Sequence, residues 1–194
     1  MGATKRIGEL YVQSLNSQSE CSFFAVRFGN VFGSSGSLVP NIIKRIRQGE
    51  PVQITHPDMT RYFMLLPEAV SLILQACLHA KGGEVFILDM GNPVKVVDLV
   101  KDLILLLGRQ PEIDVPIEFI GPRPGEKLHE ELFADGLEHR QQMDGFFVST
   151  SPVLDFDQMC RLLEDILEPD WEGQVDDLLA LIRHTVSSQA RLSL

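Results

Sequence analysis

The sequence predicts an α/β fold, in which helices alternate with the strands of a parallel sheet. Segments with apolar residues three and four positions apart, typical of helices, alternate with short apolar runs, typical of buried strands. Glycine and proline residues separate most of these segments. The proportions of hydrophobic residues (44%) and charged residues (23%) are those of a globular protein, and 194 residues suffice for one ordinary domain.

Helices are predicted where this apolar spacing is flanked by residues typical of helix ends. Ser37 is a candidate N-cap, and Gly49 is a residue that commonly ends a helix. Gln158 follows three residues after Asp155, as in a capping box. Pro67 suits the first turn of a helix that begins there. The other expected helices cover residues 3–15, 38–48, 97–107, 127–133, 155–167 and 175–186.

Strands are predicted where short apolar runs lie between glycine and proline residues. The run at residues 23–28 is mostly apolar, as in an interior strand of a parallel sheet, which needs a neighbour on each side. The remaining segments are short, so we expect neighbours of this strand to be missing from the sequence. The expected strands or extended pieces cover residues 23–28, 51–55, 61–65, 84–88 and 116–120.

The charge and the apolar runs disfavour several classes of protein. The formal net charge of −10 argues against nucleic acid and anionic lipid, whose binding needs clustered lysine and arginine. No apolar run approaches the roughly 20 residues of a membrane-spanning helix. The three cysteines form no Cys-x-x-Cys pair, and His56 with Asp58 gives too few ligands for a metal ion. We therefore expect a cytoplasmic chain with no nucleic-acid partner, no membrane segment and no metal.

Two segments carry the most specific patterns. Residues 55–64 read Thr-His-Pro-Asp-Met-Thr-Arg-Tyr-Phe-Met and closely resemble the T-x-P-x-M-T-R-x-F segment of the CapD-type polysaccharide biosynthesis proteins. Residues 123–132 resemble the R-P-G-E-K-x-x-E-E-L signature of the same group. This group includes UDP-N-acetylglucosamine 4,6-dehydratases and belongs to the extended short-chain dehydrogenases/reductases.

The resemblance implies a set of substrate-binding residues. It places Arg61 and Arg123 on the nucleotide diphosphate, for which the guanidinium fork is well suited, and Glu126 on the ribose hydroxyls. Residues 26–33 resemble the segment that follows a sheet strand in these enzymes. There the resemblance places Asn30 at the diphosphate region and Val31 near the nicotinamide.

Other charged residues of the second signature are expected to have no role in binding. We expect Lys127, Glu130 and Glu131 to form a solvated helix face, with pairs three and four residues apart.

The first five residues resemble the Tyr-x-x-x-Lys element of the same superfamily, with Met1 in the position of the tyrosine. The resemblance implies that Lys5 is catalytic and binds the nicotinamide ribose. A methionine thioether has no titrating proton, so Met1 marks the catalytic position without acting as an acid or a base.

For the fold, the resemblance implies the C-terminal part of an NAD(P)-binding Rossmann-like domain without its N-terminal dinucleotide-binding strands. Residues 1–133 would form this part together with a nucleotide-sugar-binding lobe, and residues 134–194 would form a C-terminal helical extension. The sequence contains no Gly-x-x-Gly-x-x-Gly loop. We therefore expect NAD or NADP to bind the intact parent but not this chain.

For activity, the resemblance implies a UDP-N-acetylglucosamine 4,6-dehydratase of surface polysaccharide biosynthesis, present as a fragment that is inactive alone. In such enzymes carbon 4 of the sugar is oxidised, water leaves across carbons 5 and 6, and hydride returns to carbon 6. Two alternatives stay open: a nucleotide-sugar 4-epimerase of the same superfamily, and a non-catalytic nucleotide-sugar-binding module. Homo-oligomers, and an inner-membrane anchor in a missing N-terminal region of the parent, also stay open.

Overall fold

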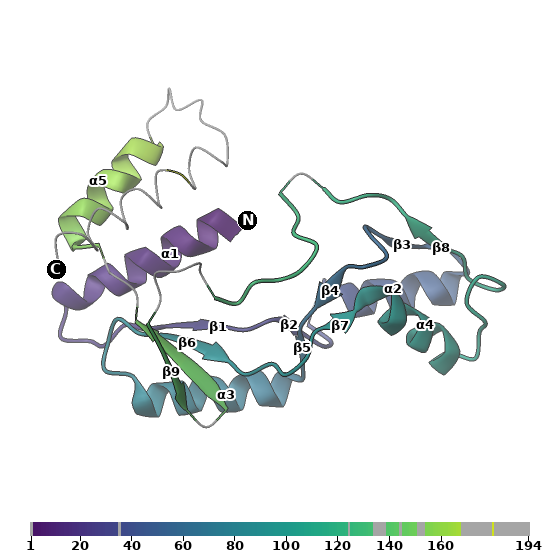
Figure 1. Ribbon diagram of the computed structural model, residues 1–194, viewed down its shortest axis with the longest axis horizontal. Helices are drawn as coiled ribbons and strands as arrows, with labels where there is room; N and C mark the ends of the chain where they lie inside the picture. Colours follow the sequence, from purple (N-terminus) through teal and green to yellow (C-terminus); the bar gives the residue numbers. More distant parts are fainter. Residues whose placement is uncertain are drawn as a thin grey trace. The chain divides into compact units, whose positions relative to one another are not determined.

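The computed structural model divides into two compact units (Figure 1). It describes residues 2–34, 36–123, 125–133, 139–143, 145–150, 154–167 and 180. The first unit comprises residues 1–27, 74–88 and 133–194, and the second comprises residues 28–73 and 89–132. Helices and strands alternate along most of the described chain, which confirms the predicted α/β class.

A four-stranded sheet with the order β1-β6-β10-β9 forms the centre of the first unit. β1 (Ala25–Arg27) runs parallel to β6 (Val85–Leu88). β10 (Phe146–Thr150) pairs antiparallel with both β6 and β9 (His139–Met143). All four residues of β6 are buried between its two neighbours. β1 was expected to be buried but is only half-buried, because within the described residues it pairs with β6 alone.

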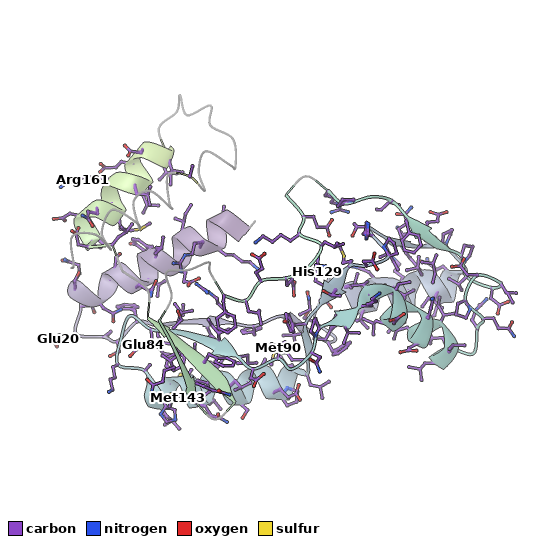
Figure 2. The ribbon with its side chains drawn as sticks, in the orientation of Figure 1. Glu20, Glu84, Met90, His129, Met143 and Arg161 are labelled. Carbon is purple, nitrogen blue, oxygen red and sulfur yellow. The ribbon has the colours of Figure 1, made fainter. Side chains whose placement is uncertain are left out.

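The hairpin of β9 and β10 lies within the residues for which only a helical extension was expected. That expectation is wrong for residues 139–143 and 146–150, which are strands. Aromatic and β-branched side chains at Phe146, Phe147 and Val148 favour a strand, and β6 supplies its backbone partners. Met143 ends β9 (Figure 2), and the Asp-Gly pair that follows it is the sequence signal for a tight hairpin.

The helices of the first unit include α1 (Gly2–Ser14), the short 3-10 helix η1 (Leu15–Ser17) and α5 (Phe156–Leu167). The capping box predicted for α5 is confirmed. The Gln158 N–H donates to Asp155 Oδ1 at 2.8 Å, and the Asp155 N–H donates to Gln158 Oε1 at 3.2 Å. The core between the helices consists of Leu10, Leu154, Met159 and Leu162. The helix expected over residues 175–186 lies outside the described residues, apart from one position.

The second unit packs two helices against short strands. The helix expected over residues 38–48 is confirmed as α2 (Leu38–Gln48), and Gly49 ends it in the left-handed conformation with φ 70°. The remaining elements are α4 (Val96–Leu106), the parallel pairs β2 (Asn30–Val31) with β5 (Phe63–Met64) and β3 (Val52–Ile54) with β8 (Ile117–Phe119), and the antiparallel pair β4 (Thr60–Arg61) with β7 (Val94–Lys95).

The core of this unit is aliphatic and lies between α2, α4, β3 and β8. It consists of Ile42, Ile46, Val52, Ile54, Met59, Val96, Val100, Ile104, Val115 and Ile117. Helix α3 (Leu66–His79) contains residues of both units. Among the described residues, no helix combines the length and the apolar character that crossing a membrane requires.

Candidate functional site

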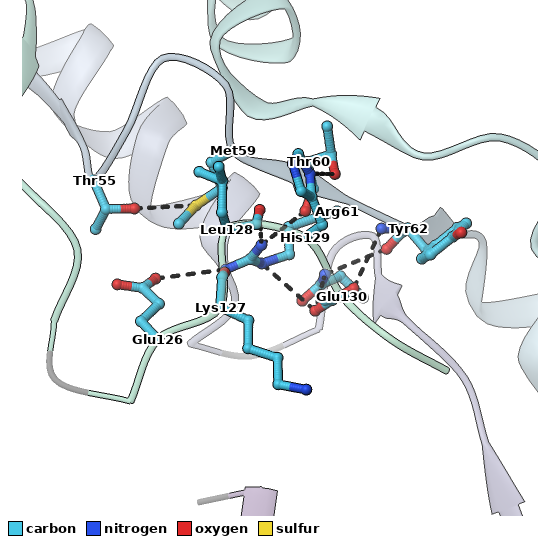
Figure 3. Close-up of polar contacts among 11 residues, drawn as sticks. Thr55, Met59, Thr60, Arg61, Tyr62, Glu126, Lys127, Leu128, His129 and Glu130 are labelled. Carbon is cyan, nitrogen blue, oxygen red and sulfur yellow. Dashed lines mark hydrogen bonds and ion pairs between the residues drawn. The ribbon is translucent and has the colours of Figure 1, made fainter. Parts of the chain in front are cut away.

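Residues expected to bind substrate meet around the guanidinium of Arg61, in the second unit (Figure 3). Its Nη1 donates to the carbonyl oxygens of Thr60 at 2.7 Å and Leu128 at 3.1 Å, and its Nη2 donates to the carbonyl oxygen of Lys127 at 3.0 Å. The side chain is only 13% exposed. Two of these three contacts thus tie β4 to a segment 66 and 67 residues further along the chain.

Two carboxylates flank the same guanidinium. Glu126 Oε1 lies 3.6 Å from Arg61 Nη2, and Glu130 Oε1 lies 3.5 Å from Arg61 Nε. The other oxygen of Glu126 accepts the Arg123 N–H at 3.1 Å, while the Glu126 N–H donates to the Arg123 carbonyl at 2.9 Å. Glu126 therefore closes a turn that begins at Arg123, and the exposed Arg123 side chain brings a second positive charge to this segment.

The segment that carries these carboxylates is not the helix expected over residues 127–133. The Thr60 N–H donates to the Leu128 carbonyl at 3.1 Å, and Thr60 and His129 form a parallel bridge. Arg61 holds the carbonyls of Lys127 and Leu128, which a helix would use for its own hydrogen bonds. Long-range contacts thus override the local helical pattern of this segment. Its residue His129 is labelled in Figure 2.

Two neighbouring carboxylates of this non-helical segment have different partners. Glu131 is 55% exposed and forms an ion pair with Lys127 at the surface, whereas Glu130 lies against Arg61. The expectation that Glu130 belongs to a solvated helix face is therefore wrong, although the pair of Lys127 and Glu131 is exposed as expected.

Asn30 joins the cluster from β2. Its N–H donates to the Tyr62 carbonyl at 2.8 Å, and its Nδ2 lies 3.3 Å from that oxygen and 3.4 Å from Glu130 Oε1. Val31, the residue expected near the nicotinamide, is half-buried and lies opposite Met64 in β5.

The structure brings together part of the expected site. Asn30, Arg61 and Glu126 share one cluster, and Arg123 takes part through its backbone. Lys5 is exposed on α1 in the first unit, and Met1 lies outside the described residues. Sequence reasoning missed the contacts of Glu130. Its place inside the second signature was the available signal, but that signal did not distinguish it from Glu131.

Solved structures with the same arrangement of elements define the class of fold. Pen from Bacillus thuringiensis is 35% identical, with a TM-score of 0.69, over 79% of this chain and 48% of that one. A UDP-N-acetylglucosamine 4-epimerase from Methanobrevibacter ruminantium M1, solved with UDP-N-acetylmuramic acid, is 26% identical. Its TM-score is 0.53, over 66% of this chain and 42% of that one. The fold is that of the extended short-chain dehydrogenases/reductases, as predicted.

Within this class, the chain belongs to the polysaccharide biosynthesis protein family, whose sequence model matches residues 1–151. The capsular polysaccharide biosynthesis protein CapD of Staphylococcus aureus is 60% identical over 144 residues, which are 74% of this chain and 24% of that protein. The chain thus spans about a quarter of the length of this relative and less than half of each of the two solved structures. The resemblance seen in the two signatures is confirmed.

Proposed function

We propose that this chain forms the nucleotide-sugar-binding part of a 4,6-dehydratase that acts on UDP-N-acetylglucosamine in surface polysaccharide biosynthesis. One observation carries the proposal. Arg61, Asn30 and Glu126 lie together beside a turn that presents Arg123, and these residues come from the segments that carry the family patterns.

In this proposal the diphosphate is bound chiefly by Arg123. Its exposed guanidinium can donate two parallel hydrogen bonds to phosphate oxygens. Arg61 has fewer donors available for a phosphate. Both N–H groups of its Nη1 and one N–H group of its Nη2 donate to backbone oxygens. Its remaining Nη2 donor faces Glu126, so a bound phosphate competes with that carboxylate.

Glu126 and Asn30 complete the proposed site. The Glu126 carboxylate is partly exposed and can accept hydrogen bonds from the two hydroxyls of a ribose. Asn30 supplies an amide three residues after the carboxyl end of the parallel strand β1, and ligands bind beyond such strand ends in open α/β sheets. The proposed roles of these residues are to bind and orient the substrate.

The residues of this chain do not make up a complete site for NAD or NADP. The sequence lacks the glycine-rich loop that approaches a pyrophosphate, and the proposed cofactor contacts are limited to Lys5 and Val31. We therefore expect the chain alone to have no turnover of UDP-N-acetylglucosamine. Turnover by the purified chain would contradict this.

A 4-epimerase of the same superfamily is the second candidate, because one of the solved relatives bears that name. In a longer protein that carries this segment, a product lighter by one water molecule would support the dehydratase. A product of unchanged mass would support the epimerase. Lys5 and the position of Met1 keep their proposed catalytic role in both cases.

Calorimetric titration of the purified chain with UDP and, separately, with NAD tests the binding proposal. We expect UDP to bind and NAD not to bind. Replacement of Arg123 by alanine should weaken UDP binding about tenfold or more, because it removes charge-assisted hydrogen bonds worth roughly 1.5–3 kcal/mol. Arg109→Ala is the matched control, since Arg109 is an exposed arginine just beyond α4 in the same unit.

Each titration result has a clear consequence. Equal affinity of wild type and Arg123→Ala would refute the role of Arg123. UDP binding without NAD binding is also what a non-catalytic binding module would show, and such a module would remain inactive within any longer protein. Binding of neither ligand would contradict the proposed site in this chain.

A further inference from the structure

The Glu130 carboxylate lies at the point where three parts of the second unit meet (Figure 3). Its Oε2 accepts the Tyr62 N–H at 3.3 Å. Its Oε1 lies 3.4 Å from Asn30 Nδ2 and 3.5 Å from Arg61 Nε. One side chain thus contacts an amide from β2, a guanidinium from β4 and the backbone between β4 and β5.

All three partners of Glu130 are hydrogen-bond donors. A carboxylate can satisfy them because both of its oxygens accept. A glutamine of the same shape has one accepting oxygen and one NH2 group, which would face either the Tyr62 N–H or the two side-chain donors. The arrangement therefore requires two accepting oxygens, which a carboxylate has and a glutamine amide lacks.

The charge of Glu130 works against the ligand proposed for this cluster. A negative charge 3.5 Å from Arg61 Nε offsets part of the positive potential that would attract a diphosphate. Glu126 flanks the same guanidinium. On charge alone, removal of either carboxylate should tighten the binding of an anion. If Glu130 aids binding, it does so through the positions of its neighbours.

We propose that Glu130 is a positioning residue for nucleotide-sugar binding, which holds the Asn30 amide and the Arg61 guanidinium in place. This inference rests on the proposed function of the cluster. The contacts order Asn30 through both its backbone and its side chain, because Tyr62 accepts from Asn30 and donates to Glu130. Preorganised groups bind more tightly because less ordering remains to be done when the ligand arrives.

The test compares Glu130→Gln with Glu131→Gln in the full 194-residue chain, with UDP as the probe. Both variants lose one negative charge in the same segment, but Glu131 is exposed and pairs with Lys127. We expect Glu130→Gln to weaken UDP binding about tenfold, and Glu131→Gln to leave it within about twofold or to tighten it. UDP binding that is unchanged or tighter in Glu130→Gln would overturn the proposal.

A double-mutant cycle with Asn30→Ala separates positioning from a general loss of structure. If Glu130 acts through Asn30, Glu130→Gln costs less affinity in the Asn30→Ala background than in the wild type. Strictly additive losses of affinity would count against positioning. So would a Glu131→Gln variant whose melting temperature and UDP affinity fall as much as those of Glu130→Gln.

A measurement without ligand keeps the inference distinguishable from the proposed function. If the wild type does not bind UDP, the proposed function fails. The NMR signals of the Asn30 side-chain amide and the Tyr62 backbone amide still report on the contacts. We expect these signals to shift in Glu130→Gln and not in Glu131→Gln. Unchanged signals in Glu130→Gln would refute the positioning role.

Discussion

Replacement of Gly29 by alanine tests how tightly the backbone of the cluster is packed. Gly29 precedes Asn30 and does not have a positive φ, so alanine can adopt its backbone conformation. The obstacle is contact. An added Cβ would lie 2.7 Å from both the Cβ and the carbonyl oxygen of Tyr62, and 3.0 Å from the methyl group of Met90.

The cost follows from which of these neighbours can move. Ordinary contact begins at 3.4 Å, so Tyr62 must retreat by about 0.7 Å. The Met90 methyl ends a flexible side chain, but the Tyr62 oxygen accepts the Asn30 N–H at 2.8 Å. Overpacking costs about 1–3 kcal/mol, and a broken hydrogen bond adds about 1 kcal/mol. We expect Gly29→Ala to lower the free energy of unfolding by about 2–4 kcal/mol.

Urea unfolding of wild type and variant measures this difference, provided that both show the same dependence on urea. Gly8→Ala is the control, because a Cβ at Gly8, inside α1, meets nothing within 4 Å. That change should stabilise the chain by about 0.5–1 kcal/mol through helix propensity alone. A Gly29→Ala chain within about 0.5 kcal/mol of the wild type would refute the packing argument.

Three further changes test other contacts by urea unfolding. Ile46→Ala truncates a fully buried side chain of α2 and should lower the free energy of unfolding by about 2–5 kcal/mol. Replacement of the exposed Lys44 by alanine should change it by no more than about 0.5 kcal/mol, and equal effects would contradict the described core. Asp155→Ala removes the cap of α5 and should cost about 1 kcal/mol with a loss of helical circular dichroism, which Glu164→Ala should not cause. Glu9→Gln weakens the contacts of Glu9 to Arg27 at 2.5 Å and to Arg6 at 2.6 Å, and should lower the free energy of unfolding by about 1–3 kcal/mol. Glu20→Gln, at an exposed position, is the control, and equal stability of the two variants would refute the argument.

The sequence predicts those elements whose determinants are local. Helix α2 begins and ends at the predicted residues, because its buried isoleucines are four positions apart and Gly49 takes the left-handed conformation that ends it. The capping box of α5 likewise depends only on two residues three positions apart. Patterns of this kind are visible without knowledge of the rest of the molecule.

The parts that the sequence did not predict depend on distant partners. The segment after Glu126 has a helical pattern, but Arg61 and Thr60, more than 60 residues earlier, hold it in a non-helical conformation. This conformation also decides which of two adjacent glutamates faces the cluster. Glu130 and Glu131 are chemically identical, so no local property of the sequence distinguishes them. β10 similarly depends on β6 for its backbone partners.

The division of the chain into interleaved segments has a consequence for the order of folding during synthesis. Ala25 of β1 pairs with Val85 of β6, and Leu88 of β6 pairs with Phe146 of β10, so the central sheet depends on pairings between distant residues. Such pairings form slowly, because long loops must close before any contact is gained. All residues of the second unit have left the ribosome once residue 132 has emerged, whereas the first unit still lacks its hairpin. At that stage the nascent chain contains every residue of the second unit, but β10 is not yet available to pair with β6. During this interval the edge of β6 that later binds β10 can contact chaperones or pair with wrong strands.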